Sequence, residues 1–300
     1  MKYVVTGGAG FIGSNLVDRL VLTSNEVYVI DNFSSGKKTN CNNRAHYFDL
    51  DLSDDNNYKK FLEILYGTDT VFHTAAKARV QQSIANPVLF EKNNTLGLVN
   101  ILKASVDMKV RRFVYSSSSS VYGMNQNLPL QENNYPEPMS PYGAQKLYGE
   151  TICKTFSKVY GIETVCLRYF NVYGEKQNTE ESNSLVLGIF LNQKKNNLPL
   201  TIRGDGSQKR DFTYVGDVVE ANILASSSNL VGKGESINIG RGKSISIKEL
   251  AKMISNNFVF IDDVLEPKNN LSNSQKAFDL LGWKSETDIK DWIIKASLKT

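Results

Sequence analysis

The feature that most constrains the fold is a glycine-rich turn between a short strand and a helix at the start of the chain. Residues 2–6 form a β-branched run, glycines follow at Gly7, Gly10 and Gly13, and residues 14–20 continue at helical spacing. Glycine lets the backbone turn sharply and approach a pyrophosphate, which then rests on the first amides of the helix. This order of strand, glycine turn and helix predicts an α/β domain that binds a dinucleotide.

An acidic residue ends the second expected strand. Residues 26–30 lead to Asp31 and Asn32, about twenty residues past the glycines, where a ribose-binding acid belongs. Aspartate accepts hydrogen bonds from a 2′-hydroxyl and repels a 2′-phosphate, so NAD is expected rather than NADP. Lys37 and Lys38 would suit a 2′-phosphate, but lysines in a polar loop are usually solvated.

Strands alternate with helices through the first half of the chain. Further strands are expected at residues 45–48, 70–74, 112–116 and 162–168, with helices from 93 to about 108 and from 141 to about 160. Such alternation predicts a Rossmann-type, doubly wound parallel sheet, here over residues 1–170.

The character of the chain changes after Asn171, where a polar stretch follows and no glycine turn recurs. A smaller α/β substrate-binding domain is expected over residues 171–300, with 211–242 returning to the first domain. Helices are expected there at 245–255, 277–281 and 288–298.

Composition narrows the class of partner. The chain has 300 residues, 41% of them hydrophobic and 22% charged, and its net charge of +4 includes no long basic run. This gives no basis for nucleic acid or an anionic membrane as partner, and no segment approaches ~20 apolar residues. Cys41, Cys153 and Cys166 are widely spaced, and with only His46 and His73 no metal site is expected. His73 is expected in the core, and the cysteines fit a reduced cytoplasmic setting.

A tyrosine and a lysine stand four residues apart near the middle of the chain. Ser140 and Pro141 are typical of a helix start, so Tyr142 and Lys146 should project from one helix face. A phenol ionises near ~10, so a base at neutral pH needs roughly 4 kcal/mol of phenolate stabilisation. One ammonium and one cationic cofactor ring would supply it. An isolated pair of this kind is more often a pair of surface neighbours.

A serine run overlaps the end of the strand expected at 112–116. Residues 116–120 are all serine and lead directly into Val121, Tyr122 and Gly123. Serine-rich stretches are commonly linkers, but this one is short and follows an apolar strand. Because open parallel sheets bind ligands at the carboxyl edge of their strands, the run is expected at a ligand site.

Taken with Asn171 and the three residues before it (Arg-Tyr-Phe), these motifs resemble the extended short-chain dehydrogenases/reductases of the nucleotide-sugar 4-epimerase kind. The resemblance covers nearly the whole chain and includes UDP-glucose and UDP-N-acetylglucosamine 4-epimerases. It implies Ser118 as catalytic hydroxyl, Tyr142 as base and Lys146 as its support. Implied cofactor contacts are Gly7, Gly10, Phe11, Ile12, Gly13, Asp31, Asn32, Ser35, Gly36, Asp51, Leu52, Ala75, Ala76, Asn94, Tyr142, Lys146 and Tyr169. Implied substrate contacts are Ser118, Ser119, Ser120, Tyr142, Asn171, Val186, Arg210, Lys268 and Asn270, with residues 183–186 near the uracil.

The serine run also separates the chain from related reactions. In similar nucleotide-sugar 4,6-dehydratases, Asp-Glu follows the hydroxyl residue because elimination of water needs its own acid and base. Ser119 and Ser120 occupy those places here. This disfavours 4,6-dehydration, and the missing glutamate also disfavours a decarboxylating xylose synthase.

One stretch departs from the family. Where such enzymes usually carry Arg-x-Gly-Asp to hold the diphosphate, residues 263–266 are Asp-Val-Leu-Glu, with Lys268 just after. A lysine supplies charge but not a planar bidentate fork, so nucleotide affinity and nucleotide choice stay open. The position that limits the sugar pocket falls on Asn270, whose small size favours tolerance of a 2-acetamido sugar.

The resemblance implies reversible C4 epimerisation of a UDP-hexose through a 4-keto intermediate, with tightly bound NAD. The alternatives are a UDP-glucuronate 4-epimerase or an NDP-4-keto-sugar reductase on the same scaffold, and, from another class, a non-catalytic dinucleotide-sensing module. That module has no need for Ser118, Tyr142 and Lys146 together. Related enzymes also suggest a homodimer formed through the helices expected at 94–108 and 141–160.

Overall fold

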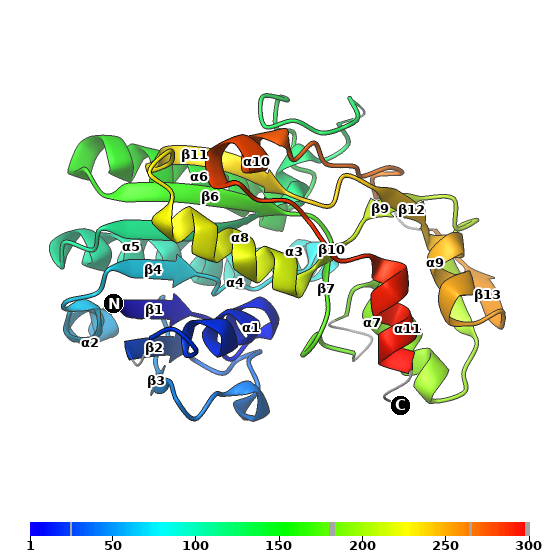
Figure 1. Cartoon of the computed structure of the whole chain (residues 1–300), viewed down its shortest axis with the longest axis horizontal. Coiled ribbons are helices and arrows are strands. Elements are labelled where there is room, and N and C mark those ends of the chain that lie inside the picture. The colour runs from blue at the N-terminus through cyan, green and yellow to red at the C-terminus, as the bar shows by residue number, and fades with distance from the viewer. Residues whose placement is uncertain (25, 126, 180–183, 264–265, 298–300) are drawn as a thin grey trace.

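A parallel sheet forms the centre of the larger part of the molecule (Figure 1). The computed structural model describes residues 1–24, 26–125, 127–179, 184–263 and 266–297. Over these residues seven strands pair in the order β11-β6-β5-β4-β1-β2-β3, all parallel. They are β1 (Lys2–Thr6), β2 (Glu26–Asp31), β3 (His46–Asp49), β4 (Thr70–His73), β5 (Arg112–Ser118), β6 (Glu163–Tyr169) and β11 (Lys233–Ile239). The predicted Rossmann-type sheet is confirmed.

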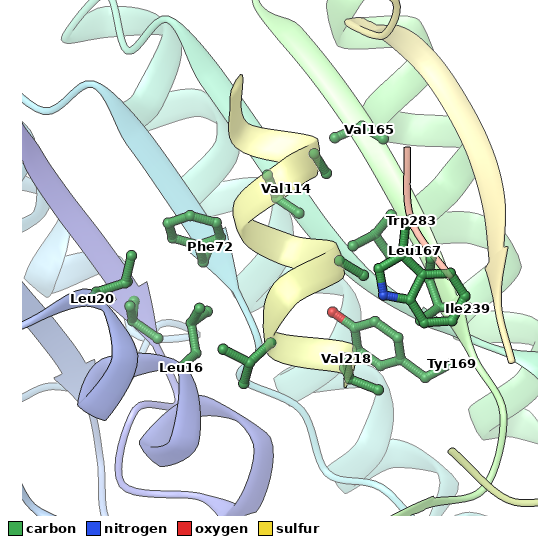
Figure 2. Packing of buried hydrophobic residues seen from close by; sticks show 14 of the residues in the cluster. Leu16, Leu20, Phe72, Val114, Val165, Leu167, Tyr169, Val218, Ile239 and Trp283 are labelled. Atoms are coloured by element: carbon green, nitrogen blue, oxygen red, sulfur yellow. The ribbon is translucent and has the colours of Figure 1, made fainter. Parts of the chain in front are cut away.

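Helices cover both faces of this sheet because successive strand residues face opposite sides. In β1, Val5 joins a core beneath α1 (Phe11–Leu20) and α8 (Val215–Ser227). Val4 joins a second core beneath α2 (Tyr58–Leu65), α5 (Gly97–Asp107) and α6 (Pro141–Tyr160). Both valines are fully buried, and each such side chain contributes about 1.5–3 kcal/mol to folding. Figure 2 shows α8 lying over Phe72 on the first face.

The smaller domain has its own core, built on short strand pairs. Its pairs are β7 (Val172–Tyr173) with β10 (Thr213–Tyr214), β8 (Leu200–Arg203) with β13 (Phe258–Ile261), and β9 (Lys209–Asp211) with β12 (Ser244–Ser246). Helices α7 (Val186–Lys195), α9 (Ile247–Ile254) and α11 (Ile289–Ser297) pack around Phe190 and Leu250. The carboxyl ends of the central strands point toward this domain (Figure 1).

One helix of the late chain lies elsewhere than expected. The segment at 277–281 was assigned to the substrate-binding domain, yet α10 (Gln275–Leu281) packs on the central sheet. Its Ala277 and Leu281 belong to the same core as α1 and α8. So does Trp283, which follows the helix (Figure 2). The Trp283 Nε1 donates to the carbonyl oxygen of Asp217 in α8 at 2.8 Å, which fixes this placement.

Candidate active site

The site is built where the strand order reverses, between β1 and β4. Gly7 has φ +71°, and a Cβ there would lie 2.6 Å from the Ala75 Cα. A Cβ on Gly13 would overlap the Gly7 carbonyl oxygen and lie 2.6 Å from the Thr74 Oγ1. Only glycine therefore lets the turn after β1 pack on the turn after β4, which brings Ala75 beside the glycines.

The N-terminus of α1 is open to an anion. Gly10 precedes the helix and offers no side-chain cap, and the first turn, which starts with Phe11 and Ile12, contains no acidic residue. The first amides of a helix have no partner within the helix and lie at the positive end of its dipole. The residues of this turn therefore fit the pyrophosphate of a dinucleotide.

The predicted ribose acid is anchored to the same turn. The Asp31 carboxylate accepts from the backbone N–H of Ala9 at 2.9 Å and of Phe33 at 2.8 Å. Burial raises the pKa of this carboxyl group, and each oxygen keeps lone pairs that can accept a ribose hydroxyl. A Cβ on Gly36 would lie 2.8 Å from the Ala9 Cβ, so the loop that carries Ser35 and Gly36 folds back onto the glycine turn.

The predicted adenine contacts lie at the ends of the next strands. Asn32 forms a side-chain hydrogen bond with Asp51. Burial acts to raise the pKa of the Asp51 carboxyl group, but hydrogen bonds with Ser53 act in the opposite direction, and the net effect is a lowered pKa. The Asp51 Oδ1 accepts from the N–H of Ser53 at 2.8 Å and from its hydroxyl at 2.7 Å. Leu52 is buried in the core below. The structure thus brings Asn32, Asp51 and Leu52 together just past the carboxyl ends of β2 and β3.

Asn94 has a structural task that the sequence did not reveal. Its Oδ1 accepts from the Lys77 N–H at 2.8 Å, and its Nδ2 donates to the Lys77 carbonyl at 3.0 Å and to the Gln145 Oε1 at 2.9 Å. Both amide hydrogens are used in this way. Asn94 therefore fastens the turn that carries Ala75 and Ala76 to α6.

The hydroxyl and the phenol that were predicted to be catalytic, Ser118 and Tyr142, meet at the end of β5. This strand runs two residues further than expected and ends on Ser118, whose Oγ accepts from the Ser120 N–H at 3.1 Å. Helix α6 begins as predicted, with the Ser140 Oγ accepting from the Gly143 N–H at 3.1 Å. This start places Tyr142 so that its phenol forms a hydrogen bond with Ser118.

Burial and two neighbouring groups set the electrostatics of Tyr142. Burial raises the pKa of the phenol, whereas a hydrogen bond with Ser118 and the charge of Arg79 lower it. The Lys146 Nζ, predicted to support the phenolate, donates to the Ser116 carbonyl at 2.6 Å and lies 5.9 Å from the centre of the Tyr142 ring. Lys146 is only 3% exposed, and this burial lowers its pKa to about 8.

Arg79 was not among the predicted site residues. It lies between β4 and α3 (Val80–Ala85) and interacts electrostatically with Tyr142. The signal available in the sequence was a lone arginine soon after the small residues that follow a strand. That signal is too common to single out a site.

A buried ion pair supports this edge of the sheet. The Arg168 Nη2 donates to the Glu150 Oε2 at 2.6 Å, and both side chains are almost fully buried. The Glu150 carboxylate also accepts from Ser117 in β5 at 2.5 Å and from Ser236 in β11 at 2.8 Å. Glu150 therefore joins α6 to the strands beside it, and Tyr142 lies two helical turns before it.

Tyr169 of β6 and the serines at the end of β5 are the remaining predicted residues of this part of the site. The Tyr169 hydroxyl lies 3.0 Å from both the Ser116 Oγ and the Asn222 Oδ1, and burial raises its pKa to about 12. Ser119 and Ser120 are half-buried just past β5. Among the described residues, the Ser120 Oγ is buried without a hydrogen-bond partner, so it can still bond to a ligand.

The other predicted substrate residues, beyond Ser118, Ser119, Ser120 and Tyr142, belong to the smaller domain. The Asn171 Nδ2 donates to the Asn270 Oδ1 at 3.1 Å, and the Arg210 Nη1 donates to the Lys268 carbonyl at 3.4 Å. Arg210 also forms an ion pair with Glu266 at 2.9 Å. The sequence had not suggested this pairing. It places the Glu266 carboxylate against the arginine that was predicted to bind the diphosphate.

Other predicted substrate positions are less closely defined. Val186 starts α7 and packs against the core of the smaller domain. Asn183, expected near the uracil, lies outside the described residues, as do Val264 and Leu265 of the departing stretch.

Known proteins resemble this chain over its full length. A family model described as the NAD dependent epimerase/dehydratase family matches residues 3–240. UDP-glucose 4-epimerase of Streptococcus mutans is 30% identical over 325 residues, covering 100% of this chain and 96% of that protein. UDP-N-acetylglucosamine 4-epimerase from Methanobrevibacter ruminantium, solved in complex with UDP-N-acetylmuramic acid, has a TM-score of 0.92 at 36% identity, covering 99% of this chain and 98% of that one. UDP-glucose 4-epimerase from Thermotoga maritima, solved with UDP-glucose, has a TM-score of 0.93 at 33% identity, covering 99% and 100% of the two chains.

Proposed function

The chain belongs to the NAD dependent epimerase/dehydratase family, and from this premise we propose that it inverts C4 of a UDP-hexose. The resemblance to nucleotide-sugar 4-epimerases is confirmed by the family and by the similar enzymes. NAD is confirmed as the cofactor of this family. The hydrogen bond between Ser118 and Tyr142, at the ligand edge of a dinucleotide-binding sheet, is the observation that carries the proposal.

The side chains divide the work of proton transfer and binding. When bound, NAD would supply the hydride acceptor and donor that the oxidation and reduction of C4 need. Tyr142 as phenolate accepts the proton of the 4-hydroxyl, and Ser118 bridges the two oxygens. Residues 7–13 hold the pyrophosphate, Asp31 the adenosine ribose and Lys146 the nicotinamide ribose. The 4-keto sugar rotates within the pocket so that its other face can be reduced, and Tyr142 returns the proton.

The substrate is a UDP-hexose, with room for a 2-acetamido group. Asn171 and Asn270 form a hydrogen-bonded polar pair, and the family resemblance assigns Asn270, a small residue, to the position that limits the sugar pocket. The similar enzymes named above act on UDP-glucose and on UDP-N-acetylglucosamine. We propose that both sugars and their C4 epimers are accepted.

Chromatographic separation of the products tests the reaction. The purified protein is incubated separately with UDP-galactose, UDP-N-acetylgalactosamine and UDP-galacturonate. We expect the first two to reach equilibrium with their C4 epimers without net consumption of NADH. Conversion of UDP-galacturonate alone would indicate the uronate enzyme, and stoichiometric use of NADH a reductase. Tyr142→Phe should lose nearly all turnover and keep its NAD, and turnover in this variant would place the base elsewhere.

We also propose a homodimer. Val88, on α4 (Pro87–Glu91), is 81% exposed, and Ile84 and Leu89 beside it are about half exposed. Tyr148 of α6 is also exposed and lines a hollow with Val88 and Pro87. Clustered exposed apolar side chains favour association, and the occupant best matched to this surface is a second copy of the chain.

The cytoplasm is the location we propose. Cys41, Cys153 and Cys166 are free thiols, which suits a reducing compartment. In the described part of the chain, no helix has the length and apolar character needed to cross a membrane.

A further inference from the structure

A turn of the smaller domain reaches across to the domain that carries the glycine turn. It follows β7 directly, at residues 174–177, and the Gln177 N–H donates to the Gly174 carbonyl at 3.3 Å. Gly174 has φ +143°, and a Cβ there would overlap the Val215 side chain of α8. Only glycine lets the turn pack this closely on α8, and this packing fixes where the next residues lie.

Glu175 is held from both domains. Its carboxylate accepts from the Tyr214 hydroxyl of β10 and from the Trp292 Nε1 of α11, each at 2.9 Å. Its backbone carbonyl accepts from the Asn15 Nδ2 of α1, also at 2.9 Å. One residue therefore joins two elements of the smaller domain to the helix that follows the glycine turn.

Lys176 makes a second connection between the domains. Its Nζ forms an ion pair with the Asp18 Oδ2 of α1 at 2.5 Å and donates to the Asn40 carbonyl at 3.3 Å. The Asp18 Oδ1 accepts from the Asn42 Nδ2 at 2.8 Å. Asp18 and Lys176 together therefore hold the segment 40–42 at both of its ends.

This segment belongs to the loop between β2 and β3, which folds onto the glycine turn. The Asn40 Nδ2 donates to the Ala9 carbonyl at 3.0 Å, and a Cβ on Gly36 would lie 2.8 Å from the Ala9 Cβ. The same loop carries Asn32 and Ser35, which with Gly36 are predicted cofactor contacts. Movement of the loop away from Ala9 would break those contacts, so bonds that fasten the loop slow the release of a bound dinucleotide.

We propose that Asp18 and Lys176 form a latch between the smaller domain and this loop, and that the latch keeps NAD bound between turnovers. Both are positioning residues, because they act through the loop and not on the dinucleotide itself. The latch depends on NAD binding at residues 7–13 and is independent of which sugar reacts. The two side chains are 39% and 27% exposed, so solvent screens the pair and the effect on NAD release is moderate.

Exchange of bound NAD for labelled NAD tests the latch without any sugar. Protein loaded with unlabelled NAD is mixed with an excess of deuterated NAD, and mass spectrometry follows the bound cofactor over time. We expect Lys176→Met and Asp18→Asn each to exchange NAD about tenfold faster than wild type. Lys176→Arg should keep most of the slow exchange, because a guanidinium can pair with the same carboxylate.

Two further variants separate a latch from a general loss of stability. The double variant of Asp18→Asn and Lys176→Met should exchange NAD within about twofold of Lys176→Met alone, because the two residues act through one ion pair. Arg19→Gln removes an ion pair of similar exposure between α1 and Glu220 of α8, which does not involve the loop. This control should exchange NAD at the wild-type rate.

Three results would overturn the latch: wild-type exchange in both single variants, accelerations that multiply in the double variant, or an equal acceleration by Arg19→Gln. Faster exchange in the latch variants of a protein that turns over no UDP-sugar would contradict the proposed function and leave the latch standing. Turnover of a UDP-sugar, with exchange that the variants do not change, would leave the proposed function standing and remove the latch.

Discussion

Tyr142 is held by opposing influences. Burial favours its neutral form, whereas Ser118 and Arg79 favour the phenolate. A phenol placed in such an environment without those partners would be a poor base at neutral pH. The reactivity of this tyrosine is thus a property of its neighbours, and each neighbour can be removed in turn.

Ser118→Ala removes the hydroxyl that bonds to the phenol. We expect kcat to fall by about a hundredfold, in the lower part of the range for a positioned proton-transfer group. Bound NAD, measured by absorbance after denaturation, should stay at the wild-type level because the proposed contacts of Ser118 are with the sugar and Tyr142. A variant with near wild-type kcat would show that the sugar hydroxyl reaches Tyr142 without a bridge.

Lys146 predicts a dependence of stability on pH in the cofactor-free protein. Its pKa is about 8 when folded, against 10.5 for the free side chain. Between these values the unfolded chain binds the extra proton, so this residue makes stability rise with pH. The unfolding free energy of wild type minus that of Lys146→Met should therefore increase by about 2–3 kcal/mol from pH 7 to pH 10. Urea titrations of both proteins at the two pH values measure it, and a flat difference would contradict the buried ammonium.

The sequence predicted Ser118, Tyr142 and Lys146 as site residues because their order and spacing match a family motif. Arg79 was not predicted, because its electrostatic effect on Tyr142 depends on distant segments of the chain lying together in the fold. Asn94 was noted for the cofactor, but its bonds to Lys77 and Gln145 depend on distant segments meeting. Residues whose roles depend on tertiary contacts leave no periodic signal in the chain.

At the scale of the element, the glycine turn can be tested with a matched control. Gly7 and Gly67 share φ +71°, but a Cβ on Gly7 meets the Ala75 backbone, whereas a Cβ on Gly67 has open space within 4 Å. Gly67→Ala should cost only the left-handed strain of about 1–2 kcal/mol and keep NAD. Gly7→Ala should lose more stability than that and release NAD. Equal behaviour of the two variants, by thermal melting and NAD content, would argue against close packing of the two turns.

The ion pair beneath α6 makes a second element-scale prediction. Arg168→Met leaves the Glu150 carboxylate buried without its cation, and we expect a loss of about 3–5 kcal/mol. The double variant with Glu150→Gln should lose clearly less than the sum of the single losses, because no unpaired charge is left. Urea unfolding of the four proteins gives this cycle. Additive losses would mean that the two side chains do not interact.

Element boundaries were predictable where local chemistry marks them. Ser140 caps the start of α6 and Gly161, at φ +77°, ends it, and both were predicted. The end of β5 was not, because the sequence gives no sign that Ser117 would bond to Glu150 of α6. Bonds of this kind extend a strand through residues that are commonly found in loops.

At the scale of the whole molecule, the exposed face on α4 predicts the oligomeric state. Wild type should sediment as a dimer, and Val88→Glu should shift it to monomer because a charge in an apolar interface is costly. Leu230→Glu is the control, since Leu230 is 65% exposed and lies just before β11 on the central sheet. A monomeric wild type, or dissociation by both variants, would count against this face.

The position of each late segment depends on which hydrophobic core it joins. Residues 211–242 hold α8 and β11, which pack on the central sheet. The segment with α10 and Trp283 joins them there, although in the chain it lies between β13 and α11 of the smaller domain. Amphipathic spacing shows that a helix has an apolar face but not which core receives it.

The position of β11 has a consequence for synthesis. This strand pairs with β6 at one border of the sheet, yet about sixty residues, most of them in the smaller domain, separate the two strands along the chain. A nascent polypeptide that has reached only residue 170 presents the open flank of β6, a template for unwanted strand addition. The flank of β6 is covered only once β11 has been synthesised and residue 239 has left the ribosome. Chains that terminate between residues 170 and 239 should therefore aggregate rather than form a usable nucleotide-binding domain.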